Sequence, residues 1–145
     1  MSRETADFQD AELALRAYEL RRETVMRASR DAITFQFWPK SYEDIQAVSS
    51  RPEHSLNPPL RQISSFWEMV YGMVRHGIVN ADFFLESNGE GLFLFAKVQP
   101  FLEQIRRDSG PNAYRNAEWV ATECEAGQKR YAVIKTRVAK MAESR

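Results

Sequence analysis

The sequence predicts an all-α fold, a compact bundle of five to seven helices that begins with a long N-terminal helix. Apolar residues recur at spacings of three and four through most of the chain, and this spacing lines one face of an α-helix. Proline, glycine and asparagine separate these stretches where helices would begin and end. The segment 33–38 alternates with period two, as a strand does, but no partner strand is apparent and we therefore predict helix.

The first helix is predicted to follow seven frayed residues and to end at Pro39. Arg22 and Ser29 interrupt its apolar stripe, which favours one exposed helix over a sustained coiled coil. Glu12 and Arg16 form an i,i+4 pair in the favourable order. The stripe has heptad-like spacing and consists of Phe8, Ala11, Leu15, Tyr18, Val25 and Ala32.

Two helices are predicted between Pro39 and Gly77. Ser41 can cap a short helix over residues 42–48, and residues 49–59 have the composition of a loop. Asn57 is expected to cap the next helix, because the two prolines that follow it are tolerated in a first turn. Gly77 should end this helix, since glycine adopts positive φ at no steric cost.

The remaining helices of the core are also separated by residues that commonly begin or end helices. Asn80 should cap a short helix that ends near Asn88, and Pro100 should kink or break the next one. Gly110 separates the last helix of the core. The core is predicted to centre on Phe66, Val70, Phe84, Phe95, Leu102 and Val120.

The C-terminal segment, residues 128–145, is predicted to be a basic amphipathic helix. It carries six basic and one acidic side chain in a chain of zero net charge. Four apolar residues share one helical face, and the basic residues lie mostly elsewhere. We expect this segment to pack along the first helix of the same chain or of a dimer partner. The predicted interaction surface consists of Tyr131, Ile134, Val138, Met141, Lys129, Lys135, Arg137 and Lys140.

No pattern of catalytic, cofactor-binding or metal-ligating residues is recognisable. Only His54 and His76 are present and no Glu-x-x-His pair occurs, so we predict no metal. Cys124 lies between two glutamates, which would raise the pKa of its thiol and make it a poor nucleophile. The aromatic residues around Trp67 are interpreted as core packing, with a small-molecule pocket as the alternative. We therefore predict a protein that is not an enzyme and needs no cofactor.

The central part of the chain resembles a known family. The segment FWEMVYGMVRHGIVNADFFLES, a Phe/Leu-rich helix and the segment PNAYRNAEWVATE carry the resemblance, which covers roughly residues 35–127. The chain here is similar to a bacterial family of short all-helical domains of unknown function. Its motifs are structural: an aromatic helix, an RxGxV-type turn and a second aromatic helix. Members often carry an N-terminal membrane helix, which is not found in this sequence, and the resemblance implies no activity.

The length of 145 residues is that of a single domain. The single cysteine and the absence of an apolar N-terminal leader favour a cytoplasmic protein. We expect a soluble domain that acts by binding another protein or itself. The alternative is a module that uses its basic C-terminal segment to bind an anionic surface, either nucleic acid or acidic lipid.

Overall fold

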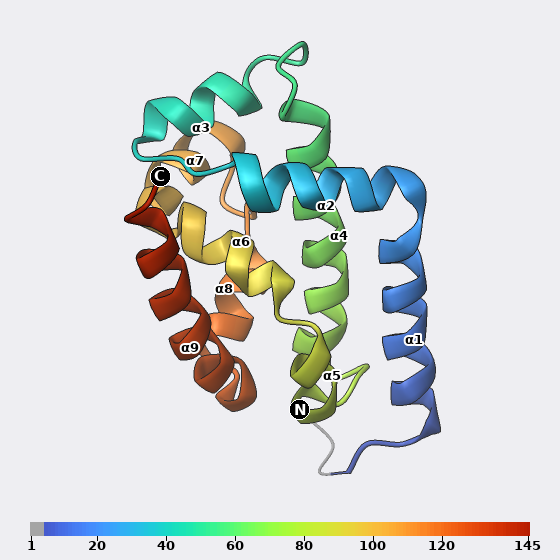
Figure 1. Ribbon diagram of the computed structural model, residues 1–145. Helices are drawn as coiled ribbons and strands as arrows, with labels where there is room; N and C mark the ends of the chain where they lie inside the picture. The colour runs from blue at the N-terminus through green and yellow to red at the C-terminus, as the bar shows by residue number, and fades with distance from the viewer. Residues whose placement is uncertain (1–4) are drawn as a thin grey trace.

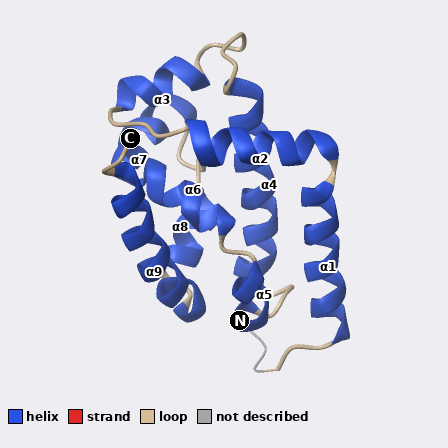
Figure 2. Ribbon diagram, viewed as in Figure 1, coloured by secondary structure: helices blue, strands red, loops and turns tan. Residues whose placement is uncertain are grey.

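The computed structural model describes residues 5–145, and in these residues the chain forms α-helices and no strand (Figures 1 and 2). The all-helical prediction is confirmed, but the helices are more numerous than expected. The described residues form nine α-helices and one short 3-10 helix, η1. Their bounds are α1 Phe8–Arg22, α2 Thr24–Gln36, α3 Tyr42–Ser49, α4 Asn57–Arg75, α5 Ala81–Ser87, α6 Glu90–Val98, η1 Gln99–Phe101, α7 Leu102–Ser109, α8 Arg115–Thr122 and α9 Glu125–Ala142.

The long N-terminal helix is divided into α1 and α2, so this prediction is wrong. Glu23 has an extended backbone, with φ −59° and ψ 144°, and its carboxylate accepts a hydrogen bond from the Met26 N–H at 3.0 Å. Helix α2 then crosses α4, whereas α1 runs beside α5 (Figure 1). On the two sides of this bend, Ala17 of α1 and Ile33 of α2 are both buried. Of the predicted frayed residues, 1–4 lie outside the described part of the chain, and Asp7 caps α1.

The segment with alternating apolar residues is helical as far as Gln36, as predicted, and no strand forms there. Phe37 is 2% exposed and ends α2, with its N–H donating to the Ile33 carbonyl at 3.3 Å. Trp38 has left the helix, because a residue before proline avoids the helical conformation. The period-two alternation therefore belongs to a helix end, at which Phe37 is buried in the core while Phe35 is exposed.

The caps of α3 and α4 agree with the predictions except at one residue. Ser41 caps α3 through its hydroxyl, and Gly77 follows α4 with φ 71°. The N-cap of α4 is Leu56, however, and Asn57 is the first residue within the helix. The Asn57 side chain is buried and donates to the Val48 carbonyl at 2.9 Å, so it connects α4 to the end of α3.

The later helix boundaries follow the predicted signals. The Asn80 side chain caps α5 by accepting the Phe83 N–H at 2.9 Å. Pro100 lies in η1, the short 3-10 helix that interrupts the α-helical conformation between α6 and α7. Gly110 ends α7 with φ 105°, a conformation that favours glycine.

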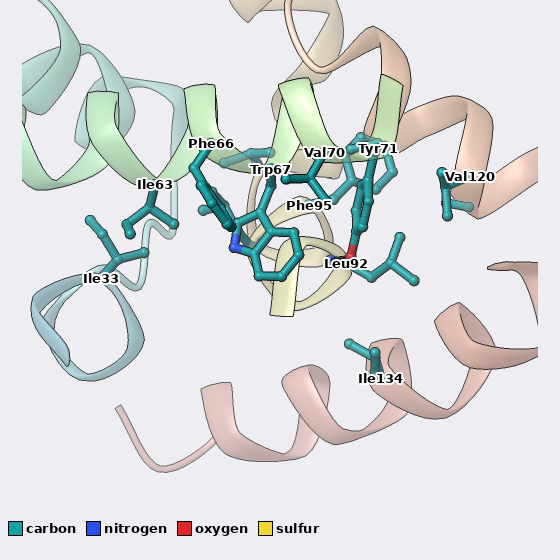
Figure 3. Packing of buried hydrophobic residues seen from close by; sticks show 14 of the residues in the cluster. Ile33, Ile63, Phe66, Trp67, Val70, Tyr71, Leu92, Phe95, Val120 and Ile134 are labelled. Atoms are coloured by element: carbon teal, nitrogen blue, oxygen red, sulfur yellow. Dashed lines mark hydrogen bonds between the residues drawn. The ribbon is translucent and has the colours of Figure 1, made fainter. Parts of the chain in front are cut away.

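Helix α4 lies at the centre of the bundle and packs on α2, α3, α6 and α8. All six residues predicted for the core are buried. Figure 3 shows Val70 and Tyr71 of α4 beside Leu92 and Phe95 of α6. Trp67 packs edge-to-face on Phe66, with ring centroids 5.0 Å apart, so it belongs to the core.

Helix α9 packs on α5, α6 and α8, on the side of the bundle away from α1 (Figure 1). The prediction that it lies along the first helix of the same chain is wrong. Gly127 explains the observed position, since a Cβ atom there would lie 1.8 Å from the Val120 carbonyl oxygen. The missing side chain allows the start of α9 to approach α8 closely, which directs its apolar face onto α6.

We expect Gly127→Ala to lower the free energy of unfolding by about 3 kcal/mol, the upper end of the usual cost of overpacking, because backbone atoms of α8 cannot yield as a flexible side chain can. Chemical denaturation measures this change. Gly89→Ala is the matched control, since its added methyl would meet only the side chains of Arg130 and Ile134, at 3.0 Å. Equal stabilities for the two variants would contradict the account of the α8–α9 approach.

Candidate interaction surfaces

The apolar residues of the predicted surface on α9 are largely part of the core. Ile134 and Val138 are 5% and 7% exposed, and Tyr131 and Met141 are half-buried. The Tyr131 ring packs against that of Phe95, with centroids 5.7 Å apart. Tyr131, Ile134 and Val138 hold α9 on the bundle and are not available as an apolar docking face.

The basic residues of the predicted surface remain exposed on the outside of α9. They are Lys129, Lys135, Arg137 and Lys140, and the neighbouring Arg130 is exposed as well. Among them only Lys129 forms an ion pair within the described residues, with Glu125 at 3.5 Å. Arg130 and Arg137 also line a cavity of about 320 Å³ between α9 and the start of α6.

A second surface, which we call the α1–α5 groove, is apolar and open to solvent. Its volume is about 480 Å³, and its wall includes Ala11, Leu15 and Tyr18 from α1 and Phe83 from α5. Leu15 and Tyr18 are 63% and 51% exposed, and Phe8 on the same helix is 77% exposed. The sequence analysis identified this stripe but expected α9 to cover it. Within residues 5–145 no helix covers it.

Acidic side chains flank the α1–α5 groove on both helices. Glu12 and Glu19 lie within about one turn of Leu15 on α1, and Asp82 and Glu86 adjoin Phe83 on α5. All four carboxylates belong to exposed residues and form no ion pair within the described part of the chain. Arg21 also lines the groove, and the Arg22 guanidinium lies 5.6 Å from the Tyr18 ring centroid. The rim of the apolar floor is therefore predominantly, but not uniformly, acidic.

Buried polar contacts fix α1 against α5. The Asp10 carboxylate is fully buried and accepts the Asn80 N–H at 2.8 Å. Arg21 donates to the Asn88 side-chain carbonyl, and its guanidinium lies 5.2 Å from the Trp67 ring centroid. Burial lowers the pKa of Arg21, whereas the Glu90 carboxylate raises it. The sequence analysis missed these residues, because nothing local distinguishes them from the exposed charges of α1.

Lys97, in the last turn of α6, is a buried cationic side chain. It is 5% exposed, and its Nζ donates to the Ile33 carbonyl at 2.9 Å and to the Thr34 carbonyl at 3.2 Å. The same atom lies 4.0 Å from the Trp38 ring centroid. Burial, and to a smaller extent the charge of Arg145, lower the pKa of Lys97 to about 7.

The Lys97 pKa predicts a pH dependence of stability. In the unfolded chain this amine has a pKa near 10.5, so between about pH 7 and 10 the unfolded state binds more protons. The free energy of unfolding is therefore expected to rise with pH across this window. Denaturation of Lys97→Met should lack the rise, whereas the exposed control Lys135→Met should retain it. The same pH dependence of stability in the unmodified protein, Lys97→Met and Lys135→Met would show that Lys97 is not its source.

The other residues considered for chemistry have structural positions. Cys124 is a buried free thiol and His76 caps the C-terminus of α4. Within residues 5–145 no group of three or more His, Cys, Asp or Glu side chains could hold a metal ion. No helix in the same range is both long and apolar enough to cross a membrane.

The fold and surfaces define an all-helical domain with two contrasting faces, an acidic-rimmed apolar groove and a basic helix. Residues 6–124 match the family described as Domain of unknown function (DUF4760). The match covers most of the chain, so the chain belongs to this family and the predicted resemblance is confirmed. The match ends one residue before α9, which lies outside it. Comparisons with curated proteins and with solved structures gave no match.

Proposed function

We propose that this domain is a non-enzymatic interaction module that binds a basic amphipathic helix of a partner protein in the α1–α5 groove. The observation that carries the proposal is the combination of exposed apolar residues with an acidic rim. Leu15 and Tyr18 offer two adjacent anchors, and Phe8 extends the surface along α1. An amphipathic helix in a groove is a recurring mode of recognition, with anchors at spacings of three and four.

The charges favour a basic partner over a second copy of this chain. A two-fold dimer through this groove would bring the acidic rims of two copies together, and like charges in contact disfavour association. A partner helix with lysines and arginines beside its apolar face would instead meet Glu12, Glu19, Asp82 and Glu86. Attraction between such exposed charges should speed association and weaken with salt.

Two synthetic helical peptides test the proposal. They share one apolar face and differ in carrying lysine or glutamate on the flanks. We expect the basic peptide to bind with saturation in fluorescence anisotropy, and Leu15→Ser or Glu19→Lys to weaken binding at least tenfold. Val133→Ser is the control, since Val133 is exposed to a similar extent (57%, against 63% for Leu15) but lies on α9.

Three results would contradict the proposal: equal affinity for the two peptides, equal binding by Leu15→Ser and Val133→Ser, or a dimer in sedimentation that Leu15→Ser abolishes. The first would remove the role of the acidic rim. The second would place the peptide elsewhere, and the third would identify a second copy as the occupant.

A second candidate function is binding of an anionic surface by the outer face of α9. Its support is the row of exposed basic side chains together with Arg130 and Arg137 at one cavity. Co-sedimentation with phosphatidylserine vesicles and titration with duplex DNA distinguish the two anionic sources. The double variant Lys135→Glu/Arg137→Glu should abolish such binding without changing peptide affinity at the α1–α5 groove. Binding that survives this variant, or no binding in low salt, would reject this function.

A further inference from the structure

The cavity between α9 and the start of α6, which we call the α6–α9 cavity, is lined by both apolar and charged side chains. The two helices pack on each other, and the cavity between them is open to solvent (Figure 1). Phe93 of α6 and Val133 and Ile134 of α9 form its apolar part. Its volume of about 320 Å³ is that of a site for a small organic molecule rather than for a single ion.

Two arginines of α9, Arg130 and Arg137, line this cavity. They are seven residues apart and therefore share one face of the helix, about 10 Å apart along its axis, with Val133 between them. Arg130 lies against the backbone at Gly89, since a Cβ atom there would be 3.0 Å from the arginine Nε. Neither arginine forms an ion pair or a side-chain hydrogen bond within residues 5–145. The cavity therefore presents two guanidinium groups that the described part of the chain leaves unpaired.

Glu90 also lines the cavity, but its negative charge is already matched. Arg30 of α2 donates from Nε to the two carboxylate oxygens of Glu90 at 2.9 and 3.1 Å. Trp67 of α4 donates from Nε1 to the Glu90 Oε2 at 3.2 Å. With Glu90 neutralised by Arg30, the positive charges of Arg130 and Arg137 determine which ligands the cavity attracts.

The two unpaired arginines and the apolar part of the cavity define the class of ligand. Guanidinium groups bind phosphate and carboxylate oxygens through paired hydrogen bonds. A phosphate monoester carries a charge of about −1.5 to −2 at pH 7, so it can match both arginines, whereas a carboxylate or a phosphodiester carries a single charge. We propose that the α6–α9 cavity binds an organic phosphate monoester, with the phosphate between Arg130 and Arg137 and the apolar group on Phe93 and Val133.

This site combines the family domain with the helix that follows it. Phe93 lies within the family match, whereas both arginines lie on α9 beyond its end. The site is independent of partner binding at the α1–α5 groove. It also differs from the attraction of an anionic surface to α9, because it depends on the two arginines at the cavity and not on the total charge of the helix.

Phenyl phosphate and its methyl ester, methyl phenyl phosphate, form a matched pair of probes that differ in charge. NMR titration of the full chain should show saturable binding of phenyl phosphate, about fivefold tighter than the diester, as expected for one further exposed charge pair. Methyl signals of Val133 and Ile134 should shift during the titration. No saturable binding of phenyl phosphate, equal affinities for the two probes, or shifts confined to other residues would overturn the proposal.

Arg137→Gln and Lys140→Gln remove the same charge from exposed positions of α9, but only Arg137 lines the cavity. Arg130→Gln and Arg137→Gln should each weaken phenyl phosphate binding about fivefold, whereas Lys140→Gln should leave it unchanged. Equal weakening by Arg137→Gln and Lys140→Gln would show a diffuse attraction to the helix and would overturn the proposal. All three side chains are exposed, so the fold is expected to tolerate these changes.

Co-sedimentation with vesicles distinguishes a lipid headgroup from a soluble phosphate ester. Phosphatidic acid has a monoester headgroup, and phosphatidylglycerol is the diester control. If phenyl phosphate binds as expected, co-sedimentation with phosphatidic acid that Arg137→Gln weakens assigns the monoester to a lipid, and its absence assigns it to a soluble ester. Both results uphold the cavity as the site. Saturable phenyl phosphate binding without any binding to phosphatidylserine vesicles or DNA would reject only the second candidate function.

Discussion

A chain truncated after Gly127 is expected to lose its cooperative thermal transition or to melt at least about 15 °C lower. Truncation removes nearly all of α9, including the buried Ile134 and Val138, and exposes the surfaces of α6 and α8 that they cover. Burial of each such side chain contributes about 1.5–3 kcal/mol, and the total stability of a domain is only about 5–15 kcal/mol. Differential scanning calorimetry of the truncated chain measures the loss.

The expected loss of stability comes from apolar contacts of α9 within one chain. A variant that keeps these contacts therefore serves as a control. The α9 surface variant Lys135→Glu/Arg137→Glu keeps the apolar contacts of the helix and should melt close to the unmodified protein. A truncated chain with an unchanged thermal transition would show that α9 is dispensable for stability. It would favour the alternative in which the basic segment serves to bind an anionic surface.

The variant Val70→Asp should also unfold the domain or destabilise it by several kcal/mol. Val70 is 3% exposed on α4 at the centre of the core, near Phe95 and Tyr71 (Figure 3). A carboxylate there would be buried without a partner, or would have to take up a proton to become neutral. Urea denaturation monitored by circular dichroism provides the measurement.

Val133→Asp makes the same chemical change at a residue that is 57% exposed. We expect its midpoint to stay close to that of the unmodified protein, because water continues to solvate the new charge. Similar midpoints for the two aspartate variants would show that the packed face of α4 has been assigned wrongly.

Local signals in the sequence were sufficient to predict the helical class, most boundaries and the core. Ser41, Asn80, Gly77 and Pro100 act within a few residues of themselves, through a cap, a positive φ or a missing N–H. The six predicted core residues are buried, as expected for apolar faces with helical spacing that pack against neighbouring helices.

The spacing of apolar residues alone did not predict which neighbouring helix, if any, covers each apolar face. The stripes on α1 and α9 looked complementary, yet α9 buries its own stripe on α6 and α8 while that of α1 remains exposed. The difference depends on Gly127, whose missing side chain allows the close approach to Val120, and on the break of the helix at Glu23. The first effect is a contact between two neighbouring helices, and the second is a choice between near-equal local conformations, so apolar spacing reports neither of them.

The features of the candidate sites also differ in whether the sequence or the tertiary structure determined them. The basic charges of the C-terminal segment and the apolar stripe of α1 were determined by the sequence itself, because composition and period specify them. The tertiary structure alone decided which of them face solvent, and it brought the Asn57 side chain of α4 onto the end of α3. Spacing along a chain defines the faces of a helix, but only the packing of distant helices determines which face is covered and where a cavity remains.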